Sequence, residues 1–84
     1  MAQSETPLSK ALVSRLDELG VSRYALSQTV AERRGESDGQ VVYSAVSRAI
    51  ADPDNRRFST VREVIEAMGG ELVIRWQEVK EIKL

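Results

Sequence analysis

The stretch from residue 40 to residue 48 concentrates side chains that can read the edges of nucleic-acid bases. It carries an amide, a phenol, two hydroxyls and a guanidinium, at Gln40, Tyr43, Ser44, Ser47 and Arg48. Glutamine can form two hydrogen bonds with adenine, arginine can do the same with guanine, and serine suits either base. On one helix these groups can face a DNA groove together. The alternatives are a half-buried tyrosine and serines that only keep the helix surface small.

A second group of side chains suits the phosphate backbone of a nucleic acid. Arginine forms bidentate hydrogen bonds with phosphate, and the start of a helix also attracts anions. Arg23 begins a predicted helix and is therefore placed to reach a phosphate. The other candidates for phosphate contacts are Arg33, Arg34, Asn55, Arg56 and Arg57. The alternative for these five is a solvated charge or a polar turn.

The composition argues against catalysis and metal binding. The chain contains no cysteine and no histidine, which removes disulfides, thiolate ligands and the commonest general base. Gly35 and Gly39 lack the Gly-Lys-Ser/Thr ending of a phosphate-binding loop, and residues 52–55 lack the glycine and glutamate of a calcium loop. We therefore expect neither an enzyme nor a cofactor.

The length and the hydropathy predict one small domain over residues 1–84. No apolar run approaches the roughly 20 residues that span a membrane, and the first residues lack the layout of a signal peptide. A cytoplasmic protein without a membrane partner is expected. The net charge of -1 argues mildly against a non-specific nucleic-acid binder. The acidic excess lies after residue 62, whereas arginine dominates the basic residues before it.

Hydrophobic periodicity predicts a helical core over residues 7–70, preceded by a frayed segment 1–6. Thr6 and Gly20 bound a first helix over 7–19, and Ser22 caps a second helix from 23 to about 33. After a loop at 34–40, we expect a third helix over about 42–51. A turn at 52–55 leads to a fourth helix, capped by Ser59 and ending near 68. The residues expected to face the core are Leu8, Ala11, Leu12, Leu16, Leu19, Ala25, Leu26, Thr29, Val30, Val42, Ala45, Val46, Ala49, Ile50, Val61, Val64, Ile65 and Met68.

The segment 71–84 predicts a β-strand, because apolar Leu72, Ile74 and Trp76 alternate with other residues at a period of two. A lone strand leaves its N–H and C=O groups unpaired, and the sequence indicates no second strand. The economical solution is an antiparallel pairing with the same strand of a second copy across a two-fold axis. We therefore predict a homodimer with Leu72, Ile74 and Trp76 at its interface. The alternatives are a frayed tail or a continuing helix.

Three motifs resemble the phage-repressor-like (Xre-type) helix-turn-helix family over about residues 8–68. Residues 22–27 (SRYALS) resemble the opening of the first motif helix of that family, and residues 45–50 (AVSRAI) are similar to its recognition helix. Residues 58–61 (FSTV), which lead into an amphipathic helix ending at Met68, resemble the helix that usually follows. The chain departs from the family at Arg33 to Gln40, which looks like an insertion into a turn that is usually tight.

The resemblance implies a mainly α, four-helix (lambda-repressor-like) domain, to which the alternation in residues 71–84 adds a C-terminal β-strand paired across a dimer. Together they predict a homodimeric, sequence-specific transcriptional regulator whose recognition helix, about 42–51, enters the major groove of double-stranded DNA. Small regulators of this family are often antitoxins that bind a toxin and repress their own operon. Two alternatives stay open: such an antitoxin with a toxin partner, and a protein-interaction module that lost DNA binding. The near-zero net charge favours the second.

Overall fold

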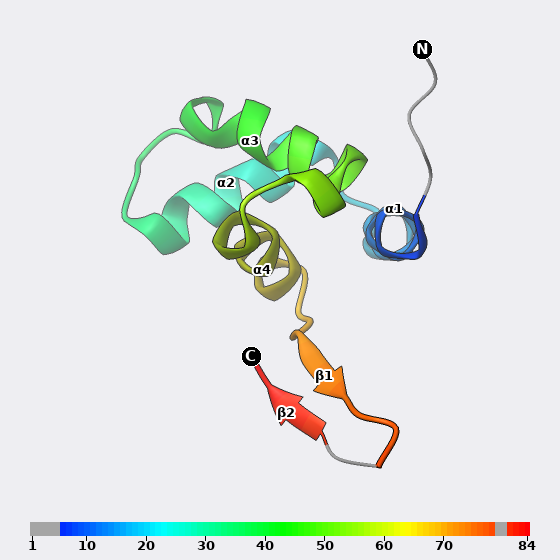
Figure 1. The fold of residues 1–84 in the computed structure, drawn as a ribbon. Helices are drawn as coiled ribbons and strands as arrows, with labels where there is room; N and C mark the ends of the chain where they lie inside the picture. Colours follow the sequence, from blue (N-terminus) through cyan, green and yellow to red (C-terminus); the bar gives the residue numbers. More distant parts are fainter. Residues whose placement is uncertain (1–5, 79–80) are drawn as a thin grey trace.

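A computed structural model describes residues 6–78 and 81–84, which form a helical body and a small β-hairpin (Figure 1). The described helices are α1 (Pro7–Leu19), α2 (Arg23–Arg34), α3 (Gln40–Ala51) and α4 (Phe58–Ala67). A 3-10 turn, η1 (Pro53–Asn55), joins α3 to α4, and strands β1 (Val73–Arg75) and β2 (Glu81–Lys83) follow. The hairpin projects away from the helical body beyond α4. The prediction of a mainly helical chain with C-terminal β-structure is confirmed.

Local signals fix the ends of α1 and the start of α2. The Thr6 hydroxyl accepts a hydrogen bond from the backbone N–H of Ser9 (3.2 Å), and the Ser9 hydroxyl accepts one from the N–H of Thr6 (3.0 Å). Gly20 ends α1 in the left-handed conformation with φ 67°, and Ser22 caps α2 through the N–H of Ala25. These predicted boundaries are confirmed. The rest of the segment predicted to be frayed, 1–5, lies outside the described residues.

The connection between α2 and α3 is shorter than predicted. Arg33 and Arg34 belong to the last turn of α2, which ends at Gly35 with φ 82° and a hydrogen bond from the N–H of Glu36 to the carbonyl of Ala31 (2.8 Å). The next helix begins at Gln40 because the Asp38 carboxylate accepts the N–H of Gln40 (2.9 Å). The predicted bounds of the loop, 34–40, and the predicted helix start at about 42 are therefore wrong. The actual connection is residues 35–39.

A close backbone contact positions the start of α3. A Cβ atom added to Gly39 would lie 2.8 Å from the backbone nitrogen of Gln28 and 2.9 Å from its Cα, so only glycine fits without a shift. The half-buried Gln28 side chain accepts the N–H of Gly39 through Oε1. α2 and α3 are thus joined by direct backbone packing and by one amide hydrogen bond.

The core lies where the four helices meet. Its fully buried side chains include Val30 from α2, Val46 and Ile50 from α3, and Val64 from α4. The buried Ser27 hydroxyl donates to the carbonyl of Arg23 (2.8 Å), which satisfies its polar group. Four residues predicted to face the core are exposed instead, because Leu19 lies in the last turn of α1 and the three alanines lie outside the buried arc of their helices: Ala11, Leu19, Ala25 and Ala45.

The start of α4 also differs from the prediction. The helix begins at Phe58, one residue before the predicted cap Ser59, and Arg57 occupies the N-cap position. The carbonyl of Arg57 accepts the N–H groups of Thr60 (3.0 Å) and Val61 (3.1 Å). Among the residues that the structure describes, no side chain caps α4, because Ser59 already lies inside its first turn.

The C-terminal segment folds back on itself. β1 and β2 are antiparallel, with Val73 opposite Lys83, Ile74 opposite Ile82 and Arg75 opposite Glu81. The predicted single strand over 71–84 is therefore wrong in the described residues, and residues 79–80 of that segment lie outside them. The sequence EIK at 81–83 was too short and too charged to indicate a second strand. The pairing partner that we assigned to another copy is in the same chain, although each strand keeps one open edge.

The contact at Gly39 predicts a loss of stability for Gly39→Ala. Gly39 has φ -63° and ψ -20°, and at such backbone angles a change from glycine to alanine usually stabilises a protein. A loss of stability would therefore be caused by the clash of the added Cβ atom with α2. We expect a decrease of about 1–3 kcal/mol in the free energy of unfolding, measured by urea denaturation. Ser37→Ala, in the same connection but exposed, should change it by less than about 0.5 kcal/mol. An unchanged or increased stability of Gly39→Ala would show that α2 and α3 do not pack this closely.

Candidate nucleic-acid interface

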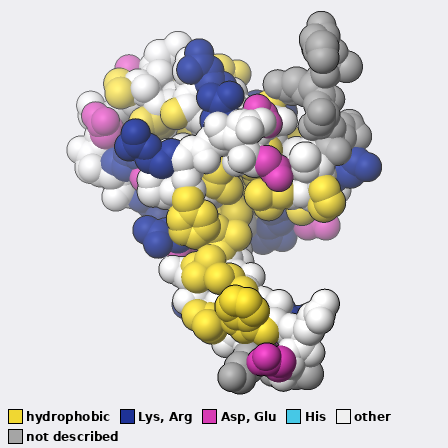
Figure 2. All heavy atoms as spheres, viewed as in Figure 1, with side chains coloured by type: hydrophobic (Ala, Val, Ile, Leu, Met, Phe, Trp, Pro, Cys, Tyr) yellow, Lys and Arg dark blue, Asp and Glu magenta, His cyan; other side chains and the backbone are white. Residues whose placement is uncertain are grey.

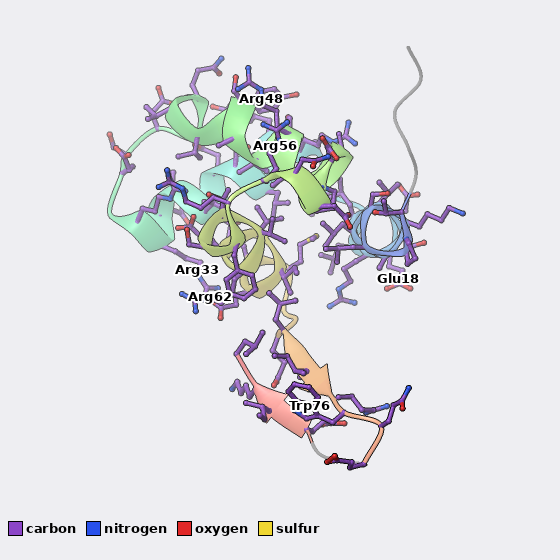
Figure 3. All side chains as sticks on the ribbon, viewed as in Figure 1. Glu18, Arg33, Arg48, Arg56, Arg62 and Trp76 are labelled. Atoms are coloured by element: carbon purple, nitrogen blue, oxygen red, sulfur yellow. The ribbon has the colours of Figure 1, made fainter. Side chains whose placement is uncertain are left out.

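One side of α3 is free of the core and carries most of the predicted base-reading residues. We call it the exposed face of α3; its members are Gln40, Val41, Ser44, Ala45 and Arg48. They fall on the side opposite the buried Val42, Val46 and Ala49, as helical periodicity requires. Figure 3 shows Arg48 on the outer side of α3, pointing away from the helical body. The helix therefore presents an amide, a hydroxyl and a guanidinium together.

Two residues on α3 differ from their expected places. Ser47 is half-buried, and its hydroxyl oxygen is buried without a hydrogen-bond partner among the residues that the structure describes. It faces the body and not the groove side. Val41, which the sequence reasoning missed, is 65% exposed. The spacing of Val41, Ala45 and Arg48 at i, i+4 and i+7 was the signal that could have found it.

An aromatic pair ties the start of α2 to the middle of α3. The rings of Tyr24 and Tyr43 lie with their centroids 6.4 Å apart and their planes at 43°. This separation is within the range of favourable aromatic contacts. Both tyrosines are exposed, so the pair forms part of the surface beside the exposed face of α3. Tyr43 is thus both packed on one side and accessible on the other.

Arg23 and the first turn of α2 lie beside this tyrosine pair. Arg23 is the first residue of α2 and is exposed. Because Arg23 precedes Tyr24 directly, the positive end of the α2 dipole sits next to the middle of α3. Backbone N–H groups at a helix start and an adjacent guanidinium form an arrangement that suits a phosphate.

The turn after α3 carries two more predicted phosphate contacts, both held by one carboxylate. The Asn55 side chain donates to both carboxylate oxygens of Asp52 (3.0 and 3.2 Å), and Arg56 forms an ion pair with it at 3.6 Å. In Figure 3, Arg56 lies on the same side of the body as Arg48. Asp52 therefore fixes these side chains next to the C-terminal end of α3.

The remaining predicted phosphate contacts lie elsewhere. Arg33 donates to the carbonyl of Glu66 (3.2 Å), and Arg34 forms two hydrogen bonds with the Glu63 carboxylate (2.7 and 2.5 Å). Figure 3 shows Arg33 and Arg62 on the opposite side of the helical body from Arg48. Arg33, Arg34 and Arg57 line a polar pocket between α2 and α4. The residues that line it are Arg33, Arg34, Arg57, Ser59, Thr60, Arg62, Glu63 and Glu66. The predicted phosphate set is thus divided between two surfaces.

The Arg34–Glu63 pair shifts the titration of both partners. The hydrogen bonds from Arg34 lower the pKa of Glu63 below its ordinary value of 4.5, against an opposing effect of partial burial. The same hydrogen bonds raise the pKa of Arg34. The pair links the last turn of α2 to the middle of α4, so it contributes to the packing of the body.

Comparison of the chain with protein-family models, curated proteins and solved structures found no match. Over residues 6–78 and 81–84, no helix is long and apolar enough to cross a membrane. Nor does this part of the chain bring together three or more acidic, histidine or cysteine side chains that could hold a metal ion.

The lowered pKa of Glu63 predicts a specific acid sensitivity. A carboxylate with a lowered folded-state pKa stabilises the fold above its unfolded-state pKa, and that contribution is lost as the pH falls from this value through the folded-state pKa. Between about pH 6 and pH 3, wild type should lose about 0.5–1 kcal/mol more unfolding free energy than Glu63→Gln. Urea denaturation across this range measures it. The control Glu32→Gln removes an exposed carboxylate from α2 and should behave like wild type. Equal acid sensitivity of wild type and Glu63→Gln would refute this role of the pair.

Proposed function

We propose that the protein is a sequence-specific DNA-binding transcriptional regulator that acts as a homodimer and inserts α3 into the major groove of double-stranded DNA. The observation that carries the proposal is the exposed face of α3 lying beside the uncovered start of α2. A helix that projects polar side chains next to a phosphate-binding helix start is the arrangement used by helix-turn-helix proteins.

The exposed face of α3 supplies distinct contacts for distinct bases. Arg48 suits a guanine through its fork, Gln40 suits an adenine through its amide, and Ser44 can donate or accept. The exposed methyl groups of Val41 suit the methyl group of a thymine. Each bidentate contact, from Arg48 or Gln40, contributes discrimination of about 1–3 kcal/mol against the wrong base.

Backbone contacts are assigned to both ends of this arrangement. Arg23 and the first N–H groups of α2 would hold one phosphate, and Asn55 and Arg56 would hold another beyond the end of α3. Asp52 orients Asn55 and Arg56 through a hydrogen bond and an ion pair. These contacts fix the register of α3 along the groove, whereas the base contacts set the sequence.

A protein-interaction module is the second candidate, and the hairpin favours it. Ile74 (37%), Ile82 (50%) and Trp76 (51%) are exposed apolar side chains on a projecting element, which suits a protein partner. An antitoxin would combine both functions, with DNA bound by α3 and a toxin bound elsewhere. The near-zero net charge also favours this interaction module.

Substitution of arginines on the two surfaces tests the DNA-binding proposal. Arg48→Ala should weaken binding to a selected site by about 1–3 kcal/mol and relax the preference at one base position. Arg23→Ala should weaken binding to all sequences alike and make the salt slope shallower by about one phosphate contact. Arg33→Ala removes the same charge on the opposite side of the body and should leave affinity nearly unchanged. Fluorescence anisotropy with sites selected from a random library, over a salt series, measures all three.

Two outcomes would contradict the proposal. Failure to select any DNA from the library at low salt would leave the interaction module as the better candidate. Equal losses for Arg48→Ala and Arg33→Ala would show that the bound DNA does not lie along the exposed face of α3.

A further inference from the structure

The hairpin has no hydrophobic core of its own. Strands β1 and β2 have three residues each, and a two-stranded hairpin alone is only marginally stable in water. Figure 2 shows a band of hydrophobic side chains that continues from the helical body along the hairpin. Each of the large apolar side chains from residue 73 onward that the structure describes is at least 37% exposed: Val73, Ile74, Trp76, Ile82 and Leu84. The element is therefore incomplete unless something adds to it.

The hydrogen bonds of the hairpin identify the edge at which a further strand can add. The N–H of Leu84 donates to the carbonyl of Leu72 (2.8 Å), so these two residues form a hydrogen-bonded pair. Pairs alternate along an antiparallel ladder, so the backbone groups of Val73 and Arg75 point away from β2. Among the described residues, no backbone group occupies this outer edge of β1. It is an open template for pairing.

Charge decides which self-pairing this edge allows. When two copies of β1 pair antiparallel around a two-fold axis, the residues whose backbone groups point away from β2 must lie opposite one another. These residues are Glu71, Val73 and Arg75. An axis at Arg75 would set two guanidinium groups opposite each other, and an axis at Glu71 would set two carboxylates together. An axis at Val73 instead places Glu71 of each copy opposite Arg75 of the other. Among the registers centred on one of these three residues, only the one centred on Val73 pairs opposite charges.

We propose that β1 pairs with β1 of a second copy around an axis at Val73, giving a four-stranded antiparallel sheet in the order β2-β1-β1-β2. The inference rests on the homodimer of the proposed function but not on its DNA binding. In this register Leu72 lies opposite Ile74 of the second copy, on the apolar face of the sheet. Trp76 lies opposite Gly70, which has no side chain to crowd the ring.

Arg75 can serve both neighbours in this sheet. Within the hairpin its guanidinium donates to the Glu81 carboxylate through Nε (2.9 Å) and also through Nη2. The guanidinium has five N–H donors, so it can also bind Glu71 of the second copy. Glu81 and Arg75 of one copy and Glu71 of the other then form a row of alternating charge across the strands. The two-fold axis produces this row twice.

The outer edge of β2 offers a competing pairing around Ile82, with Glu81 opposite Lys83. Both strands have three residues, so strand length does not separate the two pairings. We favour β1 because its register around Val73 also brings Glu71 of each copy opposite Arg75 of the other. The two pairings differ in their dependence on Glu71, which the β2 ladder does not contain.

Charge reversal separates these possibilities by sedimentation velocity of the full chain without DNA. Wild type should be dimeric. Glu71→Arg places like charges opposite each other and should raise the dimer dissociation constant by about tenfold or more. The double variant Arg75→Glu/Glu81→Arg keeps the opposite charges within the hairpin but should also lose the dimer. A mixture of the two variants restores Glu–Arg pairs across the axis and should form a heterodimer.

Each other result overturns the inference in an identifiable way. A monomeric wild type removes the homodimer itself, while DNA binding by anisotropy is judged separately. A Glu71→Arg variant that stays dimeric places the interface elsewhere, for example at the outer edge of β2. Two monomeric variants that fail to associate when mixed, with far-UV circular dichroism like that of wild type, would show that the charges do not face each other.

Discussion

The approach of Gly39 to the backbone of α2 is the contact on which the arrangement of the helices depends. It brings the start of α3 against Gln28, and the Gln28 amide accepts the N–H of Gly39 at the same place. Once this end is fixed, Val46 and Ile50 point into the core and Arg48 points out of it. Any side chain at position 39 would move the whole helix, because a rigid helix transmits a shift at one end along its length.

Two arginines form hydrogen bonds between α2 and α4, and two others lie exposed near α3. Arg34 is held by Glu63, and Arg33 by the carbonyl of Glu66, so their charges serve the packing of α2 on α4. Arg23 and Arg48 are exposed on the side of α3. This division explains how a chain with a net charge of -1 can still present a local positive surface. The charge total alone gave no indication of it.

Signals close together in the sequence were predictive, and contacts between distant residues were not. Thr6 and Pro7 at the start of α1 and Gly20 at its end each act on residues within one helical turn, so the limits of α1 could be predicted correctly. The packing of the start of α3 against α2 depends on Gln28, which lies 11 residues before Gly39, and periodicity cannot show that contact. The Arg34–Glu63 pair joins residues 29 positions apart, so Arg34 looked like a free charge in a loop. β2 was missed because its three residues carry two charges and only one apolar side chain.

The joint between the helical body and the hairpin consists of very few groups. Gly69 has φ 83°, a conformation that side chains disfavour, and the Arg62 guanidinium lies 5.9 Å from the centre of the Phe58 ring while donating to the carbonyl of Leu84 (3.5 Å). If two chains join through their hairpins, the distance between their α3 helices depends on this joint as well as on the register of the sheet. Changes at Arg62 or Gly69 would then alter the spacing between the two halves of a palindromic site without touching any residue that reads a base.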